Sequence, residues 1–361
     1  TSSTERVNKA FVKGLIARIA LYAGGFLQRT DGVRRSTDPE LSVDKMYTLA
    51  KDKTLEVIQK GSNTLGSFEQ NFRLPFSAGR GRVLFTLGVQ HRAVDQYTAQ
   101  NKGGTNGPLP YLFYDYDVED LRRDVTCVPY EWSNANPSHQ QLRSIDNWCF
   151  GKLRYEWMSR RVTSTNDDGI NWQYMRLADI YLMAAEAINE LEGSAAAAPY
   201  LKPILDRALP AAKVTAYMGQ AAASKESFFN AIVDQRALEF AGESLRKADL
   251  IRWNLLKTKL DEAKLKMTQL ISRVGPYADL PTKLYFKTAD DKETLIIYGL
   301  NHGDSDEVGA SLGYEGSTTW FDAGDLTPEL INSLYQKNPD QNQYWPIWQT
   351  FIDSSNGQLT N

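Results

Sequence analysis

The segment Arg176-Leu-Ala-Asp-Ile-Tyr-Leu-Met-Ala-Ala-Glu-Ala187 lies inside a longer stretch, 174–191, that has the residue spacing of an amphipathic helix. Its apolar positions recur at steps of three and four, which places them on one helix face. These positions are Tyr174, Leu177, Tyr181, Ala184, Ile188 and Leu191. A second stripe with the same spacing is mostly charged and consists of Arg176, Asp179, Met183, Glu186 and Glu190. The stretch therefore predicts a helix with one apolar face and one charged face.

A second long segment, 228–253, repeats this pattern. It contains Arg236-Ala-Leu-Glu-Phe-Ala-Gly-Glu-Ser-Leu-Arg-Lys-Ala-Asp-Leu-Ile-Arg-Trp253. Its charged residues again follow helical steps, and they are Arg236, Glu239, Glu243, Arg246, Asp249 and Arg252. Ser224 or Ser227 is suited to cap the start of this helix. Gly242 is expected to bend or break it.

The two charged stripes allow two interpretations. In one, both helices are solvated and each local ion pair contributes roughly 0.3 kcal/mol. In the other, the stripes face each other and form a partly buried network. We favour the network, because its acids and arginines nearly balance and an unpaired buried charge is very unfavourable. The predicted network comprises Arg176, Asp179, Glu186, Arg236, Glu239, Glu243, Arg246 and Asp249, joined by Arg252. A structural role is favoured over a catalytic one, because a general acid needs a raised pKa and a neighbouring arginine lowers it.

The two segments, in this order, closely resemble the two signature segments of the SusD/RagB family. Members of that family are outer-membrane nutrient-binding lipoproteins of Bacteroidetes. The resemblance implies a mainly α, SusD-like fold with tetratricopeptide-like helical hairpins, long aromatic-rich loops and a little short β structure. It implies non-catalytic capture of a glycan, a peptide or another nutrient oligomer on the extracellular face of the outer membrane. It also implies delivery of that ligand to a SusC-like TonB-dependent transporter.

The organisation of the chain is expected to follow that of the family in part. Family members carry a lipidated N-terminal cysteine and an N-terminal helical portion, and neither occurs here. The polar start Thr1-Ser-Ser-Thr-Glu-Arg-Val contains no signal peptide. We therefore expect one SusD-like domain, 1–361, truncated at its N-terminus and attached to the membrane only through a lipid anchor outside this chain. Its sub-regions are a helical hairpin at 1–61, an irregular ligand-side segment at 62–170, the signature helices at 171–270 and a loop-rich tail at 271–361.

Composition narrows the function classes. The 361 residues carry a formal net charge of −3, which gives no global electrostatic support to a nucleic-acid role. No apolar run approaches the roughly 20 residues that a membrane-spanning helix needs. His91, His139 and His302 are scattered, and no Cys/His spacing suits a metal, so neither a metal nor another cofactor is expected. Gly79-Arg-Gly81 lacks the third glycine of a dinucleotide-binding loop, and no Gly-x-Ser-x-Gly elbow occurs.

Helical periodicity also appears outside the signature segments. A helix is predicted at 5–25, with Thr4 as its N-terminal cap. A second helix is predicted at 43–60 and ends at Gly61. This pair, with its small inward residues, has the appearance of a tetratricopeptide hairpin, although no clean period of about 34 residues is present. Further expected elements are a helix pair at 171–192 and 199–209, a helix at 257–270, and strands at 283–287 and 294–298.

The segment 62–170 has turn residues throughout and many aromatic residues, which argue against disorder. A flat ring can cover the C–H face of a sugar, and polar neighbours can bind its hydroxyl groups. The alternative is that the rings pack the loops onto the helices, and for any single ring we favour that alternative. For the segment as a whole we favour a binding site, with rings exposed in the free protein. The predicted ligand-binding residues are Trp132 and Trp148 first, then Tyr130, Tyr114, Trp157, Asn134 and Arg143.

Two smaller features leave alternatives open. Cys127 and Cys149 are the only cysteines and could form a disulfide in an oxidising compartment, but we favour two buried free thiols. The run His302-Gly-Asp-Ser-Asp-Glu307 could offer oxygens to Ca²⁺, but it lacks the spacing of a known calcium loop. We favour a solvated acidic turn.

Three functions remain after these exclusions. The first is a non-catalytic glycan-binding surface lipoprotein. The second is a helical glycoside hydrolase, which would explain the same aromatic residues but needs an acid–base pair of carboxyl groups. The third is a helical-repeat scaffold for protein partners, in which the aromatic residues are structural. We favour the first.

Overall fold

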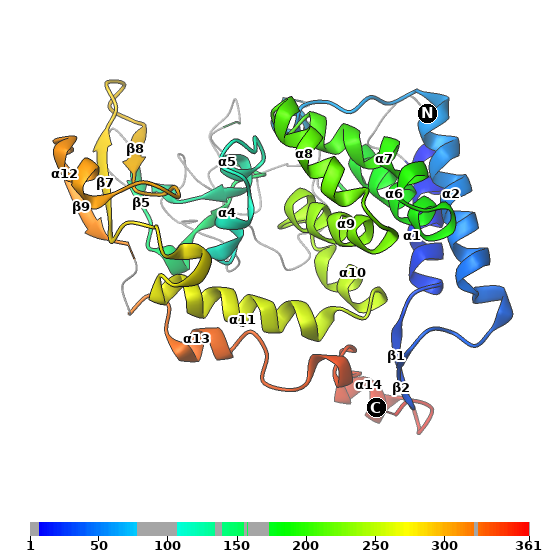
Figure 1. Cartoon of the computed structure of the whole chain (residues 1–361). Helices are drawn as coiled ribbons and strands as arrows, with labels where there is room; N and C mark the ends of the chain where they lie inside the picture. Colours follow the sequence, from blue (N-terminus) through cyan, green and yellow to red (C-terminus); the bar gives the residue numbers. More distant parts are fainter. Residues whose placement is uncertain are drawn as a thin grey trace.

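The computed structural model describes residues 7–77, 107–133, 139–154, 157, 173–320 and 324–360. These residues are mainly helical, as the sequence predicted (Figure 1). One part of the molecule is an array of long helices. The other part combines short helices, loops and small antiparallel sheets, and the long helix α11 (Leu256–Ser272) runs beside it.

The helical array is built from helices that each pack on one or more of the others. α1 (Lys9–Ala23) packs on α2 (Val43–Lys60), and α2 packs on α6 (Leu177–Glu192). α6 in turn packs on α7 (Ser194–Asp206) and α9 (Lys225–Phe240), and α8 (Ala211–Ala221) joins α7 to α9. The predicted hairpins are therefore confirmed as paired helices, although α7 begins five residues earlier than the predicted 199.

The ends of these helices follow their local sequence. Asn8 caps α1, because its side-chain oxygen accepts a hydrogen bond from the Phe11 amide at 3.0 Å; the predicted cap, Thr4, lies outside the described residues. Ser224 caps α9 as predicted, accepting from the Ser227 amide at 3.0 Å. α9 stops at residue 240 and α10 (Arg246–Arg252) follows, and Gly242 between them has a φ of 76°. This is the break expected at Gly242, because a left-handed backbone is open mainly to glycine.

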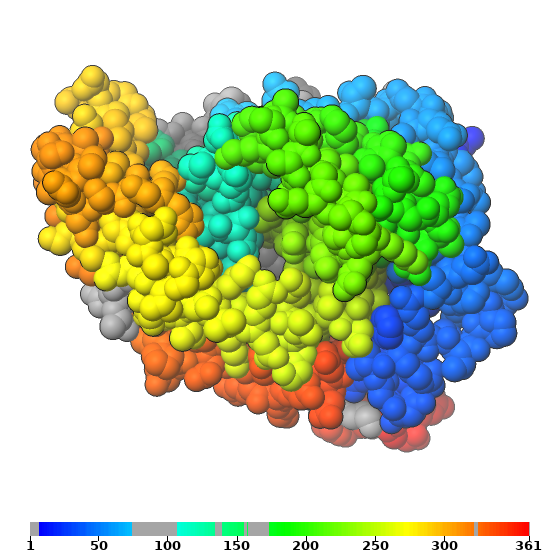
Figure 2. Space-filling view, in the orientation of Figure 1, coloured from blue at the N-terminus to red at the C-terminus, as the bar shows by residue number. Residues whose placement is uncertain are grey.

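The remaining helices of the described residues are short. They are α3 (Phe68–Ser77), α4 (Tyr111–Asp115), α5 (Arg123–Thr126), α12 (Asp306–Ser311), α13 (Pro328–Asn332) and α14 (Gln349–Ser354). Single 3₁₀ turns occur at Pro39–Leu41, Ile145–Asn147, Gly275–Tyr277 and Pro339–Gln341. Figure 2 shows the face on which the segment containing α4 and α5, in cyan, lies between the green helical array and the yellow α11 segment.

All the strand pairs among the described residues are antiparallel. β7 (Lys283–Thr288) is the centre of a three-stranded sheet with β8 (Leu295–Tyr298) and β9 (Gly316–Thr319), which confirms the two predicted strands. Two-stranded ladders join β1 (Leu27–Arg29) to β2 (Gly32–Arg34), β3 (Cys127–Val128) to β6 (Cys149–Phe150), and β4 (Tyr130–Trp132) to β5 (Gln140–Leu142). The described part of the irregular segment therefore has a backbone framework of its own.

The described residues have separate apolar cores. One lies between α6, α7, α8 and α9, with Leu182, Leu201 and Phe228 fully buried. Another lies beneath the loops and α11 and is rich in aromatic residues, including Phe113, Trp148 and Trp320. The helices and strands in this region are short and have no long apolar face of their own. Large aromatic rings therefore supply the buried apolar area here.

The β3–β6 ladder decides the state of the two cysteines. Cys127 pairs with Phe150, and Cys149 pairs with Val128. Successive residues of a strand point to opposite faces, so the two thiols lie on opposite sides of the ladder. Cys127 belongs to the aromatic core, whereas Cys149 packs with Val128 and Trp132. Both thiols are buried and neither is part of a disulfide, as the sequence analysis favoured.

Candidate functional site

The predicted charged stripes meet in the interior of the helical array. Arg236 of α9 donates hydrogen bonds to Asp179 of α6 and to Asp249 of α10, both at 2.7 Å. Arg252 bonds Asp249 at 2.9 Å and Glu186 at 2.8 Å. These groups are buried, and with one further arginine they form what we call the inner network. Its members are Arg18, Asp179, Glu186, Arg236, Asp249 and Arg252.

Two further predicted residues, Arg176 and Glu243, lie beside Glu239 of α9. Arg176 donates to Glu239 at 2.7 Å and to Glu243 at 2.7 and 2.8 Å. Lys152 donates to Glu243 at 2.7 Å and to the Glu239 carbonyl at 2.7 Å. Arg207 also pairs with Glu239. We call this second group the Glu239 network, and its members are Asp120, Arg122, Lys152, Arg176, Arg207, Glu239 and Glu243.

These contacts keep two buried carboxyl groups, Glu239 and Asp179, ionised. Burial alone would raise the pKa of Glu239, but Arg176, Arg207 and Arg122 outweigh it and lower the pKa to about 2. Burial would also raise the pKa of Asp179, but nearby arginines lower it below its usual value. Neither group can hold a proton for general acid catalysis near neutral pH. The geometry therefore supports a structural role for both networks.

One predicted member of the network is corrected by the structure. Arg246 donates to the Val233 carbonyl at 2.7 Å, and within the described chain no carboxylate lies in ion-pair distance of it. The sequence analysis did not predict several members of the two networks, because these residues lie outside the two signature stretches. They are Arg18, Arg122, Lys152 and Arg207. No helical spacing connects these side chains to the stripes.

The two leading ligand candidates have buried rings. Trp148 is 1% exposed and packs edge-on against Phe113 at 5.2 Å between ring centroids, with Trp320 at 5.3 Å. Trp132 is 6% exposed and packs with Val128. The expectation that these two rings are exposed in the free protein is therefore wrong. The physical reason is that the loops need a core of their own, and the largest apolar rings fill it.

The other candidates divide between the core and the surface. Tyr114 is half-buried, and its hydroxyl accepts from the Trp320 indole N–H at 3.0 Å. Arg143 is paired with Glu131 at 2.6 Å and bonds the Asn147 carbonyl, so it braces the loop. Asn134 lies outside the described residues. Tyr130 and Trp157 remain as half-buried rings that reach the surface.

Arg154 joins these two rings. Its guanidinium donates to the Tyr130 hydroxyl at 3.2 Å and lies 5.1 Å from the centre of the Trp157 ring. Arg73 of α3 lies over the same indole at 4.7 Å. We call these four residues, Arg73, Tyr130, Arg154 and Trp157, the Trp157 platform. It combines two partly exposed rings with two cationic hydrogen-bond donors, which is the mixture that a sugar-binding surface needs. The sequence analysis named both rings but missed both arginines.

A second aromatic surface lies at the other end of the chain. Trp345 is 86% exposed and Trp348 is 68% exposed. The polar neighbours of these rings are bonded elsewhere, because Gln343 exchanges hydrogen bonds with Gln28 and Gln349 bonds Asp353. The Lys247 ammonium lies over the Trp345 ring at 5.7 Å, whereas two guanidinium groups lie over the Trp157 ring, so we assign the site to the Trp157 platform.

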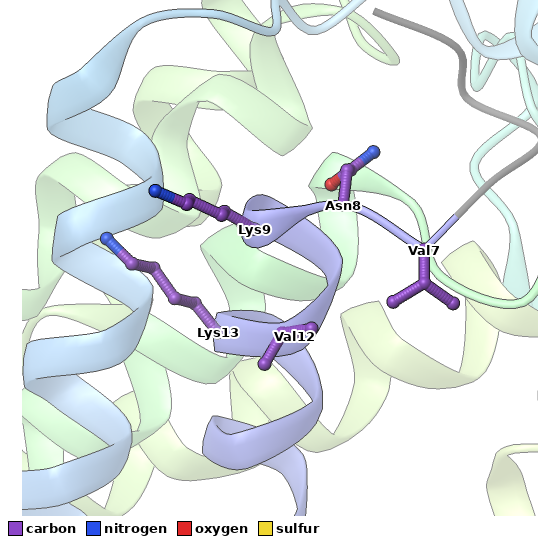
Figure 3. A pocket seen from close by; sticks show the side chains of 5 residues that line it. All are labelled: Val7, Asn8, Lys9, Val12 and Lys13. Carbon is purple, nitrogen blue, oxygen red and sulfur yellow. The ribbon is translucent and has the colours of Figure 1, made fainter. Parts of the chain in front are cut away.

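Other features contribute no site. The part of the chain that the structure describes contains no group of carboxylate, histidine and cysteine side chains that could hold a metal ion. In the acidic turn, Asp306 accepts from the Thr282 and Lys283 amides, which occupies its oxygens. An open hollow at the start of α1 is lined by Val7, Asn8, Lys9, Val12 and Lys13, and Figure 3 shows Val12 directed away from the two lysines. None of the predicted site residues lines it.

No helix among the described residues is both long enough and apolar enough to cross a membrane.

Comparisons with known proteins agree with this fold. The model of the SusD family matches residues 54–361. SusD-like protein P25 of Formosa agariphila is 30% identical over 148 residues, which are 39% of this chain and 28% of that protein. SusD-like protein P2 of the same organism is 23% identical over 265 residues, which are 69% of this chain and 51% of that protein. This chain thus spans about half or less of the length of these two relatives.

One solved structure supports the fold directly. A SusD homolog from Bacteroides thetaiotaomicron superposes with a TM-score of 0.53 at 17% identity. The match covers 93% of this chain and 64% of that one. At this identity the likeness shows the fold alone.

Proposed function

The chain belongs to the SusD family, and on that premise we propose that it is a non-catalytic protein that binds a glycan at the bacterial cell surface. The observation that carries the proposal is the Trp157 platform, where Arg154 holds the Tyr130 hydroxyl and lies against the Trp157 ring. A pyranose has an apolar C–H face and a rim of hydroxyl groups. The rings suit the face and the guanidinium groups suit the rim.

Contacts within the protein hold the Tyr130 and Arg154 side chains of the platform in place. Tyr130 belongs to β4, and its ring packs partly against Val128, Trp132 and Cys149. Arg154 also donates to the Gly151 carbonyl at 2.7 Å and the Asp124 carbonyl at 2.6 Å. A side chain already fixed in this way loses little entropy when a ligand binds. We expect dissociation constants of about micromolar to millimolar, since one platform makes few contacts and the ligand must be released.

The contacts of the described carboxyl groups support binding over hydrolysis. A glycoside hydrolase needs a carboxylic acid of raised pKa beside a carboxylate base. Burial raises the pKa of Asp115 and that of Asp234. Asp115, however, is ion-paired with Lys266 at 2.7 Å, and Asp234 faces Lys259 at 3.9 Å. A carboxylate paired with a lysine is poorly suited to donate a proton to a leaving group.

The finer proposal concerns location and partner. We propose that the whole protein is lipid-anchored on the extracellular face of the outer membrane and hands its ligand to a SusC-like TonB-dependent transporter. Family membership supports both points. Isolation of the native protein from surface-labelled cells, followed by identification of co-purifying membrane proteins, tests them. A cytoplasmic native protein with no transporter partner would contradict this part.

A glycan-array screen combined with a reducing-end assay tests the main proposal. We expect binding to at least one glycan class and no release of reducing ends over hours. New reducing ends from a bound glycan would favour the hydrolase. Capture of a protein partner with no glycan or peptide bound would favour the scaffold.

A further inference from the structure

Two buried aromatic rings of α3 face the Glu239 network. Phe68 is 2% exposed and Phe72 is 3% exposed, and the two rings meet edge-on at 5.1 Å between their centroids. Residues four apart in a helix lie on the same face. One face of α3 is therefore directed into the protein through this pair of rings.

The network presents three cations to these two rings. The Lys152 ammonium lies 5.1 Å from the centre of the Phe68 ring and 5.2 Å from that of Phe72. The guanidinium carbon of Arg176 lies 5.9 and 5.1 Å from the same two centres, and that of Arg207 lies 5.8 Å from the Phe68 centre. A cation is attracted to the face of an aromatic ring, and more strongly where water is excluded. The rings thus dock on side chains that ion pairs already hold in place.

Two hydrogen bonds also hold the backbone beside these rings. Arg207 donates to the Gly66 carbonyl at 3.3 Å, two residues before α3 begins. The Gln173 side-chain amide donates to the carbonyl of Asn71, which precedes Phe72. Because both its rings and its backbone are held, α3 is fixed along its axis and in its rotation about that axis.

The neighbouring face of α3 carries Arg73 into the Trp157 platform. Arg73 directly follows Phe72, so the two side chains leave the helix about 100° apart. The Arg73 guanidinium carbon lies 4.7 Å from the centre of the Trp157 ring. Arg73 also bonds Glu69, one turn earlier on the same face, at 2.6 Å. The docking of the Phe72 ring therefore determines where the Arg73 side chain is directed.

We propose that Phe68 and Phe72 are positioning residues for ligand binding, because their docking on the Glu239 network holds Arg73 at Trp157. Neither ring belongs to the Trp157 platform, and both are buried, so they act on a ligand only through α3. This inference rests on the proposed glycan-binding function and deepens it. It gives the buried cations of the network a second role, since the side chains that pair with Glu239 and Glu243 also orient the binding surface.

Phe72→Leu tests this connection, because leucine remains apolar but offers no ring to the cations. The probes are dextran, laminarin and xylan, and the one that binds the wild type most tightly is used for calorimetry. We expect Phe72→Leu to weaken binding about fivefold and to speed hydrogen exchange in α3. Phe228→Leu is the matched control, since Phe228 is also fully buried but belongs to the core of α6–α9. It should lower the free energy of unfolding and leave the affinity unchanged.

A double-mutant cycle identifies the route of the effect. Arg73→Gln alone should weaken binding about fivefold. Adding Phe72→Leu to it should weaken binding little further, because Phe72 acts through Arg73. Gln173→Met is a milder variant, since it removes the hydrogen bond to the Asn71 carbonyl and leaves both rings in place. It should weaken binding about twofold, and it decides the question if Phe72→Leu does not fold.

The outcomes separate the positioning role from the binding function. A loss of affinity in Phe72→Leu that is absent from Phe228→Leu and not additive with Arg73→Gln supports the inference. Wild-type affinity in both Phe72→Leu and Gln173→Met overturns it and leaves glycan binding intact. Equal losses in Phe72→Leu and Phe228→Leu would show general destabilisation and also overturn it, as would fully additive losses in the cycle. Binding to none of the probes would overturn the proposed function and the inference with it.

Discussion

Removal of the Arg176 side chain tests how much the buried charges stabilise the fold. In Arg176→Met, an unbranched apolar side chain replaces the arginine and donates no hydrogen bond. Glu239 would lose its 2.7 Å partner, and Glu243 would lose bonds at 2.7 and 2.8 Å. Both carboxylates would stay buried with fewer positive neighbours.

The size of the effect follows from two independent considerations. Breaking one side of a buried ion pair typically lowers stability by about 3–5 kcal/mol. The pKa of Glu239 falls from 4.5 to about 2, which corresponds to about 3 kcal/mol of preference for its charged form. Arg122, Arg207 and Lys152 remain as partners. We therefore expect a loss of about 3 kcal/mol, at the lower end of the range.

Urea unfolding monitored by circular dichroism measures this loss. The pH dependence adds a second check with a defined sign. Since the folded pKa of Glu239 is depressed, its contribution is present above about pH 4.5 and is lost as the pH falls towards 2. The Arg176→Met variant should show a smaller loss in this window than the wild type. Lys202→Met, at an exposed pair with Asp206, is the control. A change in Arg176→Met no larger than in this control would refute the buried-network account.

Three further predictions concern stability. Burial lowers the pKa of Lys152 to about 8, so between about pH 8 and 10 the unfolded chain binds more protons than the folded protein. In that range the free energy of unfolding of the wild type should rise by about 1 kcal/mol per pH unit relative to that of Lys152→Met. Parallel curves of unfolding free energy against pH for the two proteins would contradict this. Trp148→Ala should lower the free energy of unfolding by about 3–5 kcal/mol in urea titrations, because it empties the aromatic core; an unchanged midpoint would place this ring at the surface. Because Cys127 and Cys149 face opposite sides of their ladder, a reducing agent should leave the melting temperature unchanged, and mass spectrometry should find two free thiols.

The helical part of the fold was predictable because helical spacing is a local signal. The caps at Ser224 and Gly61 and the break at Gly242 follow from single residues whose backbone or hydrogen-bonding preferences are strong. The strands around 283–298 were predictable for the same reason. By contrast, α7 begins before the expected position because it accommodates Pro199 and Pro203 within the helix.

The site was less predictable, because it depends on contacts between distant segments. Aromatic content indicated that 62–170 contains large rings, but composition does not distinguish a buried ring from an exposed one. Trp148 is buried because Trp320, far along the chain, packs against it. Arg73 and Arg154 meet at Trp157 only in the folded protein. The charged stripes were recognisable, yet Arg18 and Lys152 joined them from outside any periodic pattern.

The most direct test of the central claim is the affinity of the best-binding glycan for Trp157→Ala, measured by isothermal titration calorimetry. Loss of one stacking ring should weaken binding about tenfold or more, with an unchanged unfolding midpoint, since the Trp157 ring is only half-buried. Trp348→Ala, which removes an exposed indole from the other aromatic surface, should bind like the wild type. If Trp157→Ala binds like the wild type and Trp348→Ala does not, the Trp157 platform is not the binding site.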